Sequence, residues 1–150
     1  MQEALAALGI DREVIQLSVS AKTSREAAEA LGVSVAQIAK SLVFTANGSP
    51  VLVIASGANR VDELKLEGLA GGKIRKADPD TVKQATGFTI GGVPPFGHTA
   101  PLPTFVDRDL LQYEVIYPAA GVPECVFPVS PEELLRATGG TVADLRLEPS

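Results

Sequence analysis

The sequence predicts a single α+β domain built on a mixed, largely antiparallel, curved sheet with surrounding helices. Helix and strand patterns alternate along the chain instead of forming separate blocks. Two apolar runs flank Asn47-Gly48-Ser49, and Asn-Gly tolerates the positive φ angles of a tight hairpin, which argues against an all-parallel sheet. The chain has 150 residues, 45% of them hydrophobic, and no repeat, low-complexity tract or linker, so we expect residues 1–150 to form one domain.

The first half of the chain carries three helical patterns, with a strand after the first and the two strands of the hairpin at the end. Thr23 and Glu26 have the spacing of a capping box, and Ser34 is placed to cap the next helix. Glycine directly follows two of the helical patterns, as is common at a helix C-terminus. Lys40 is expected where a helix hands over to a core strand. The pattern predicts helices over 3–9, 23–32 and 35–40, and strands over 13–18, 41–46 and 50–56.

The second half mixes three further helices with strands and one unusual loop. Asp62 is a plausible cap, and Asp78-Pro79 and Ser130-Pro131 have the favoured order of cap followed by an N1 proline. The run FTIGG begins as a strand and breaks into a loop rich in glycine and proline. The pattern predicts helices over 62–71, 79–87 and 131–140, and strands over 73–78, 88–92, 103–107, 113–118 and 124–130.

The composition indicates a cytoplasmic protein with no membrane span and no metal. No apolar run approaches the roughly 20 residues that a span needs, and the N-terminus lacks the basic start of a signal peptide. A single cysteine, Cys125, and a single histidine, His98, leave no cluster for a Cys/His zinc site. Cys125 lies in an apolar run where a packed thiol is expected, and a catalytic Cys-His pair is the alternative.

The charge balance limits how the chain could hold nucleic acid. The net charge of −5 argues against broad neutralisation of a nucleic-acid backbone, although it leaves room for local contact. Lys73, Arg75 and Lys76 form the densest basic group, and a solvated strand edge is the simpler interpretation of it.

The segment GFTIGGVPPFGHTAP, residues 87–101, holds four glycines and three prolines. Paired glycines let a backbone approach a ligand closely, and adjacent prolines stiffen the turn, so Gly91 to Pro95 is suited to present amide groups to an oxyanion. A rigid corner between two strands is the alternative. His98 follows this loop and is either a structural group with its hydrogen bonds satisfied or a base.

Lys40 lies within VAQIAKSLVF, among residues that should be buried. A lysine is rarely buried without a partner, so its ammonium either reaches solvent or points into a cleft. No serine is marked as a nucleophile, and neither GANR nor LAGGK has the spacing of a P-loop.

Several segments, taken in their order, resemble the YbaK/ProX family of trans-acting aminoacyl-tRNA deacylases. These are related to the editing domain inserted in bacterial prolyl-tRNA synthetases. The resemblance runs from about Ser24 to Leu145 and implies the fold of that editing domain. The segments that carry it are EAAEALGV, IAKSLVF, ANRVDELKL, ADPDTVKQATGFTIGGVPPFGH, AAGVPECVF, SPEELLRATGG and VADL.

The resemblance implies hydrolysis of the ester between a wrong amino acid and the terminal adenosine of a tRNA, without a cofactor. The family's essential lysine matches Lys40, and its GxxxP loop matches Gly91, Gly92, Val93, Pro94 and Pro95. Backbone groups of the loop would hold the aminoacyl end, the lysine would position the nucleotide end, and a ribose hydroxyl would assist the attacking water. Ser41, His98 and Gly121 complete the expected substrate-binding set. The implied partners are the acceptor end of a mischarged tRNA and, in addition, an aminoacyl-tRNA synthetase.

Two departures from the family leave the amino-acid specificity open. Members that edit Cys-tRNA often carry a Ser-Gly-Gly-x-Arg-Gly turn, where this chain has Ala119-Ala120-Gly121-Val122-Pro123. Members that act on Ala-tRNA often have asparagine after the lysine, where this chain has Ser41. We expect a tRNA such as tRNA-Pro carrying a wrong small amino acid as substrate. The alternative is a non-catalytic module that binds an aminoacyl-tRNA end or a nucleotide, or that docks on a synthetase.

Overall fold

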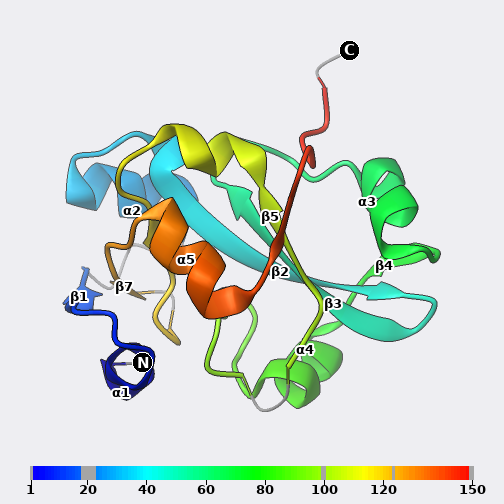
Figure 1. Ribbon diagram of the computed structural model, residues 1–150, viewed down its shortest axis with the longest axis horizontal. Coiled ribbons are helices and arrows are strands. Elements are labelled where there is room, and N and C mark those ends of the chain that lie inside the picture. The colour runs from blue at the N-terminus through cyan, green and yellow to red at the C-terminus, as the bar shows by residue number, and fades with distance from the viewer. Residues whose placement is uncertain (1, 18–22, 99–100, 123, 149–150) are drawn as a thin grey trace.

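The computed structural model describes residues 2–17, 23–98, 101–122 and 124–148. The last residue of the strand expected over 13–18, two residues of the glycine- and proline-rich segment, and Pro123 of the following turn lie outside these ranges. The described residues form an α+β fold in which helices surround a mixed sheet, as the sequence predicts (Figure 1). None of the described helices is long and apolar enough to cross a membrane.

The helices begin and end at the residues that the sequence indicates. The expected caps Thr23, Asp62, Asp78 and Ser130 each accept a hydrogen bond from an amide in the first turn of their helix. A glycine in the left-handed conformation ends each of these four helices. The described helices are α1 (Gln2–Ala7), α2 (Ser24–Leu31), α3 (Glu63–Ala70), α4 (Pro79–Thr86) and α5 (Pro131–Thr138), with 3-10 turns η1 (Val35–Gln37) and η2 (Arg108–Gln112).

The main sheet has the strand order β4-β2-β3-β5-β8, with β6 also paired to β2. The pairs β2-β3 and β2-β4 are antiparallel, whereas β2-β6, β3-β5 and β5-β8 are parallel. A separate two-stranded sheet joins β1 and β7. The strands are β1 (Ile15–Gln16), β2 (Ile38–Ala46), β3 (Ser49–Ser56), β4 (Ile74–Lys76), β5 (Thr104–Asp107), β6 (Tyr117–Pro118), β7 (Cys125–Val126) and β8 (Thr141–Ala143).

The β2-β3 hairpin forms the centre of the sheet and confirms the Asn-Gly prediction. Asn47 and Gly48 have φ angles of 50° and 85°. Positive φ at both turn residues is typical of the two-residue hairpin turn whose twist matches that of the strands. The ladder then runs from Ala46 opposite Ser49 to Ala39 opposite Ser56.

The helix expected over 35–40 is wrong beyond its first turn. Ser34 and Gln37 cap each other reciprocally, which closes a single 3-10 turn. The chain then extends directly into β2 at Ile38, whose carbonyl accepts a hydrogen bond of 2.7 Å from the amide of Gly57. Lys40 is therefore the third residue of a central strand, and the register of β2 decides where its side chain points.

The strand expected over 88–92 is also wrong, because local hydrogen bonds turn the chain there. Thr86 Oγ1 accepts a hydrogen bond of 3.0 Å from the amide of Phe88, and the amide of Gly92 donates to the carbonyl of Thr89 at 3.0 Å. Ile90, an apolar residue in the middle of the run, is 53% exposed. A threonine that bonds to nearby backbone groups competes with strand pairing, and the loop begins five residues earlier than expected.

Three further strands differ from the expectation in length or presence. The runs expected over 13–18, 113–118 and 124–130 pair over only two residues each, as β1, β6 and β7. The short strand β8 follows α5 and pairs in parallel with β5. The sequence analysis did not predict it, because three residues are too few to show an alternating pattern.

The two faces of the main sheet are covered by different helices. On one face, Val53 packs in a cluster with Leu66 of α3. On the other face, Ile54 packs in the larger core with Val82 of α4 and Leu134 of α5. Neighbouring residues of a strand point to opposite faces, so every central strand contributes to both layers.

Candidate active site

A pocket of about 700 Å³ lies beside β2, where one edge of that strand is uncovered. Strand β6 covers this edge at Ile38 and Ala39, and β4 covers it from Phe44 to Ala46. Between them, no described strand pairs with residues 40–43 on this edge. The gap opens the sheet at Lys40 and Ser41, and both residues line the pocket.

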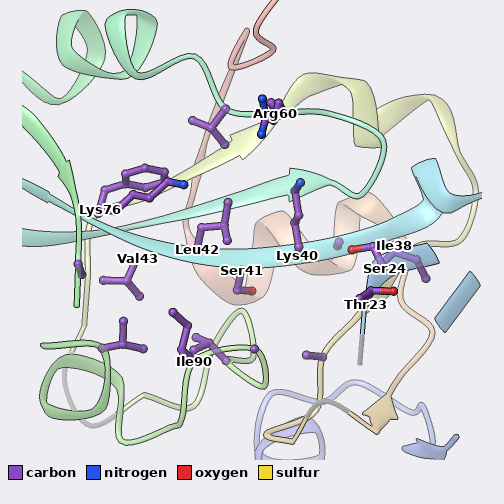
Figure 2. A pocket seen from close by; sticks show the side chains of 18 of the residues that line it. Thr23, Ser24, Ile38, Lys40, Ser41, Leu42, Val43, Arg60, Lys76 and Ile90 are labelled. Carbon is purple, nitrogen blue, oxygen red and sulfur yellow. The ribbon is translucent and has the colours of Figure 1, made fainter. Parts of the chain in front are cut away.

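The alternation of β2 divides the pocket into two halves. Lys40 lies opposite Ala55, which belongs to the core cluster on the α3 face, whereas Ser41 lies opposite Ile54 of the larger core. Figure 2 shows Lys40 and Arg60 on one side of β2, and Ser41 and Ile90 on the other. We call the first side the cationic half and the second side the loop half.

The Lys40 ammonium is half-buried and belongs to the cationic half. Burial lowers the pKa of Lys40 below its usual value, and the nearby charge of Asp107 opposes this shift. Arg60 and Lys76 lower the pKa of Lys40 further by repulsion between like charges. Lys40 forms no ion pair within the described residues. Of the two sequence-based alternatives, snorkelling or a cleft, the structure favours the cleft.

Asp107 is a fixed negative charge beneath the cationic half. Its carboxylate is 1% exposed and accepts hydrogen bonds from the Ser56 amide at 3.1 Å, the Asn59 side-chain amide at 3.0 Å and the Asp109 amide at 3.0 Å. These donors hold the carboxylate ionised and in place. The sequence analysis identified Asp107 only as a strand-end residue. It missed the electrostatic link to Lys40, for which a single sequence gives no signal.

The loop half is bordered by the glycine- and proline-rich loop. Gly91 has a φ angle of 91°, a conformation that favours glycine. The amide of Gly92 is already bonded to the Thr89 carbonyl, whereas the amides of Gly91 and Val93 donate no hydrogen bond among the described residues. Gly91 and Val93 both line the pocket. Two unpaired backbone donors are therefore available there for a ligand oxygen.

The rest of the loop packs behind the pocket. Pro94 and Pro95 are buried and do not belong to its lining. A β-carbon at Gly92 would lie 2.7 Å from the Cα of Val122, so the loop rests directly on the turn that contains Gly121. Gly121 itself has a φ angle of 102° and lies outside the lining. These residues support the loop, and a direct role for them in substrate binding stays a prediction.

Ser41 points into the loop half and has an unusual environment. Its Oγ is buried and has no hydrogen-bond partner among the described residues. A buried hydroxyl without a partner is unfavourable. A polar group on a bound ligand would satisfy it, which agrees with the expected substrate-binding role.

His98 lies behind the loop and does not line the pocket. Its Nε2 lies 2.6 Å from the carbonyl of Pro94, so Nε2 carries the proton and donates to that carbonyl. The ring also packs edge-on against Phe88, with centroids 6.3 Å apart. Burial lowers the pKa of His98, and the bond to Pro94 opposes that shift. This geometry favours the structural alternative for His98 over the base.

Replacing His98 with alanine should therefore lower catalytic activity by far less than the roughly 100-fold expected for loss of a general base. Its stability effect should depend on pH. Because the folded protein disfavours the imidazolium, the wild type loses stability as the pH falls through the usual histidine pKa of about 6.5. Melting curves of the two proteins on either side of that pH should converge at the acidic end. A collapse of activity with a pH-rate profile that follows the histidine would contradict the structural role.

The described residues hold no group of three or more histidine, cysteine, aspartate or glutamate side chains that could bind a metal ion. The free thiol of Cys125 is partly buried in β7 and packs against the larger core. It is not part of the pocket lining. Within the described residues, the reactive candidates of the pocket are therefore a lysine, a serine hydroxyl and two backbone amides.

A half-buried lysine facing unpaired amides across an open strand edge defines a class of ligand-binding α+β domain. The model of the aminoacyl-tRNA editing domain matches residues 18–137, and the chain belongs to this family. This confirms the resemblance to YbaK/ProX proteins. A crystal structure of a candidate trans-editing enzyme for prolyl-tRNA synthetase superposes with a TM-score of 0.95 at 46% identity, covering 98% of this chain and 94% of that one.

Two curated relatives match most of the chain. The uncharacterized protein YwhH of Bacillus subtilis is 35% identical over 125 residues, which are 83% of this chain and 80% of YwhH. EbsC of Enterococcus faecalis, a candidate Cys-tRNA(Pro)/Cys-tRNA(Cys) deacylase, is 29% identical over 125 residues, covering 82% of this chain and 76% of EbsC.

Proposed function

We propose that the chain is a cytoplasmic, trans-acting deacylase that hydrolyses the ester of a mischarged tRNA. The observation that carries the proposal is the meeting of the Lys40 ammonium with the unpaired amides of Gly91 and Val93 in one pocket. The family supports an ester of tRNA as the substrate class.

The chemistry requires no side-chain nucleophile. A water oxygen attacks the ester carbonyl, and the amides of Gly91 and Val93 stabilise the oxyanion that develops. The bond between the carbonyl carbon and the ribose oxygen then breaks, and the ribose oxygen leaves with a proton. The neighbouring ribose hydroxyl assists the water, while Lys40 positions the nucleotide end.

The loop half fits a small amino acid. Its walls include Val43, Val82 and Ile90, and they leave the Ser41 hydroxyl as a polar contact. An α-ammonium group can donate to that hydroxyl. The printed descriptions of EbsC and of the trans-editing enzyme concern tRNA-Pro editing, which makes tRNA-Pro with a wrong small amino acid the favoured substrate.

The test is a panel of tRNA-Pro charged with alanine, cysteine or serine, together with Cys-tRNA-Cys and correctly charged Pro-tRNA-Pro. Amino-acid release is measured with and without prolyl-tRNA synthetase. We expect rapid release from one mischarged tRNA-Pro and little from Pro-tRNA-Pro. Binding of these tRNAs without release from any of them would contradict the enzyme and favour the binding module.

A further inference from the structure

The cationic half of the pocket holds more positive charge than ester cleavage requires. Three cations line it, Lys40, Arg60 and Lys76, together with one acid, Glu63, which gives a net charge of +2 in a chain whose net charge is −5. Among the described residues, none of these three cations forms an ion pair. Positive charge is thus concentrated at one place on an acidic protein.

The sheet register directs Lys76 toward the pocket. Lys76 lies opposite Phe44 in the β2-β4 pair, and residues directly opposite each other share a face of the sheet. Phe44 is four residues after Lys40 on β2, so Lys76 and Lys40 project on the same face. Arg75, one residue earlier, lies opposite Thr45 and projects on the other face.

Arg60 reaches the same space from the loop after β3. Its carbonyl accepts a hydrogen bond of 2.8 Å from the Leu147 amide, and Val61 forms a bridge with Arg146. The backbone at Arg60 is therefore held by the C-terminal segment. Figure 2 shows the side chains of Arg60, Lys40 and Lys76 around one space on the same side of β2.

Cations gathered without anions repel one another. The effect is visible at Lys40, whose pKa both Arg60 and Lys76 lower. A bound anion would relieve this repulsion. Guanidinium and ammonium groups are the usual partners of phosphate, which they contact through charge-assisted hydrogen bonds.

We propose that Arg60 and Lys76 bind the phosphodiester groups of the 3′-terminal nucleotides of the tRNA. The terminal adenosine then lies across the open edge of β2, with its ester directed to the glycine- and proline-rich loop. This inference rests on the proposed function, because it takes the tRNA end as the ligand. It assigns Arg60 and Lys76 to binding and leaves the reacting atoms to the loop half.

The first experiment measures binding without catalysis. The dinucleotide CpA and adenosine are titrated against the isotope-labelled protein by NMR. The wild type should bind CpA more tightly than adenosine. Arg60→Gln and Lys76→Gln should each weaken CpA binding by about 10-fold, the loss expected for one charge-assisted contact, and leave adenosine binding unchanged. Arg75→Gln, with the same charge change on the opposite face, is the matched control and should bind CpA normally.

Three outcomes would overturn the assignment. Equal affinity for CpA and adenosine in the wild type would mean that no phosphate is bound. An equal loss in Arg75→Gln would mean that only the overall charge matters. Much tighter binding of inorganic phosphate or AMP than of CpA would indicate a site for free phosphate groups, because those groups carry nearly two charges and a diester carries one.

The second experiment separates this inference from the proposed function. With the mischarged tRNA, the double variant Arg60→Gln/Lys76→Gln should raise KM and leave kcat unchanged. Its KM should also depend less on salt, by about 0.7 in the logarithmic slope for each lost contact to a single strand. Deacylation with an unchanged KM would refute the phosphate site alone. The expected CpA results without deacylation of any tRNA would support the phosphate site and refute the hydrolase.

Discussion

Replacing Lys40 with alanine should reduce deacylation by about 100-fold or more, the range seen when one preorganised electrostatic contact is removed from an active site. The ammonium is half-buried in the cationic half of the pocket and forms no ion pair within the described residues. The side chain therefore contributes little to the fold beyond its methylene stem. We expect the melting temperature to change by no more than about 4 °C, which corresponds to about 1 kcal/mol in a domain of this size.

Two control variants make the Lys40 result specific. Lys40→Gln keeps most of the stem and removes the charge, so it should lose as much activity as the alanine variant. Lys73→Ala removes an exposed lysine that does not line the pocket, and it should retain activity. Turnover at the wild-type rate by a well-folded Lys40→Ala protein would show that the lysine does not take part in the reaction.

Replacing Gly92 with alanine should damage both activity and stability. The added β-carbon would lie 2.7 Å from Val122 Cα and 2.9 Å from the Gly121 carbonyl oxygen, and neither backbone atom can move without shifting the turn. Overpacking of this kind destabilises a protein by about 1–3 kcal/mol. The loop would also shift the free amides of Gly91 and Val93, so we expect about 100-fold lower activity per folded molecule.

Gly68→Ala is the matched control for this substitution. Gly68 lies within α3, and a β-carbon there meets no atom within 4 Å. The control should stabilise the protein by about 0.5–1 kcal/mol, because alanine favours the helix more than glycine does. Thermal melting and single-turnover deacylation are measured on both variants. Early melting of Gly92→Ala with full activity per folded molecule would mean that the loop is only a rigid corner.

Local sequence signals were enough to predict much of the fold. The caps at Thr23 and Asp78 and the Asn-Gly turn at residues 47 and 48 are each specified by neighbours within a few positions, and the structure confirms them. The lysine and one wall of the pocket could be located in the same way, because Lys40 interrupts an apolar run and Gly91 belongs to a distinctive loop.

The remaining features depend on contacts between segments that lie far apart in the sequence. The Asp107 carboxylate comes 67 positions after Lys40, and only the β3-β5 pairing brings the two strands together. Lys76 was interpreted as part of a solvated edge, since the β2-β4 register that directs it toward the pocket cannot be deduced from one sequence. The strand expected over 88–92 failed for a local reason, the hydrogen bond from Phe88 to Thr86.

The open edge of β2 also affects how this domain can diversify. Adjacent residues of the strand serve opposite halves of the pocket, because Lys40 faces the cationic half and Ser41 faces the loop half. A substitution at Ser41 can thus reshape the compartment proposed for the amino acid without altering the one proposed for the nucleotide. Substrate choice and nucleotide affinity become separately adjustable, so new specificities can arise by single substitutions on one face of a strand while the grip on the shared end of every tRNA is preserved.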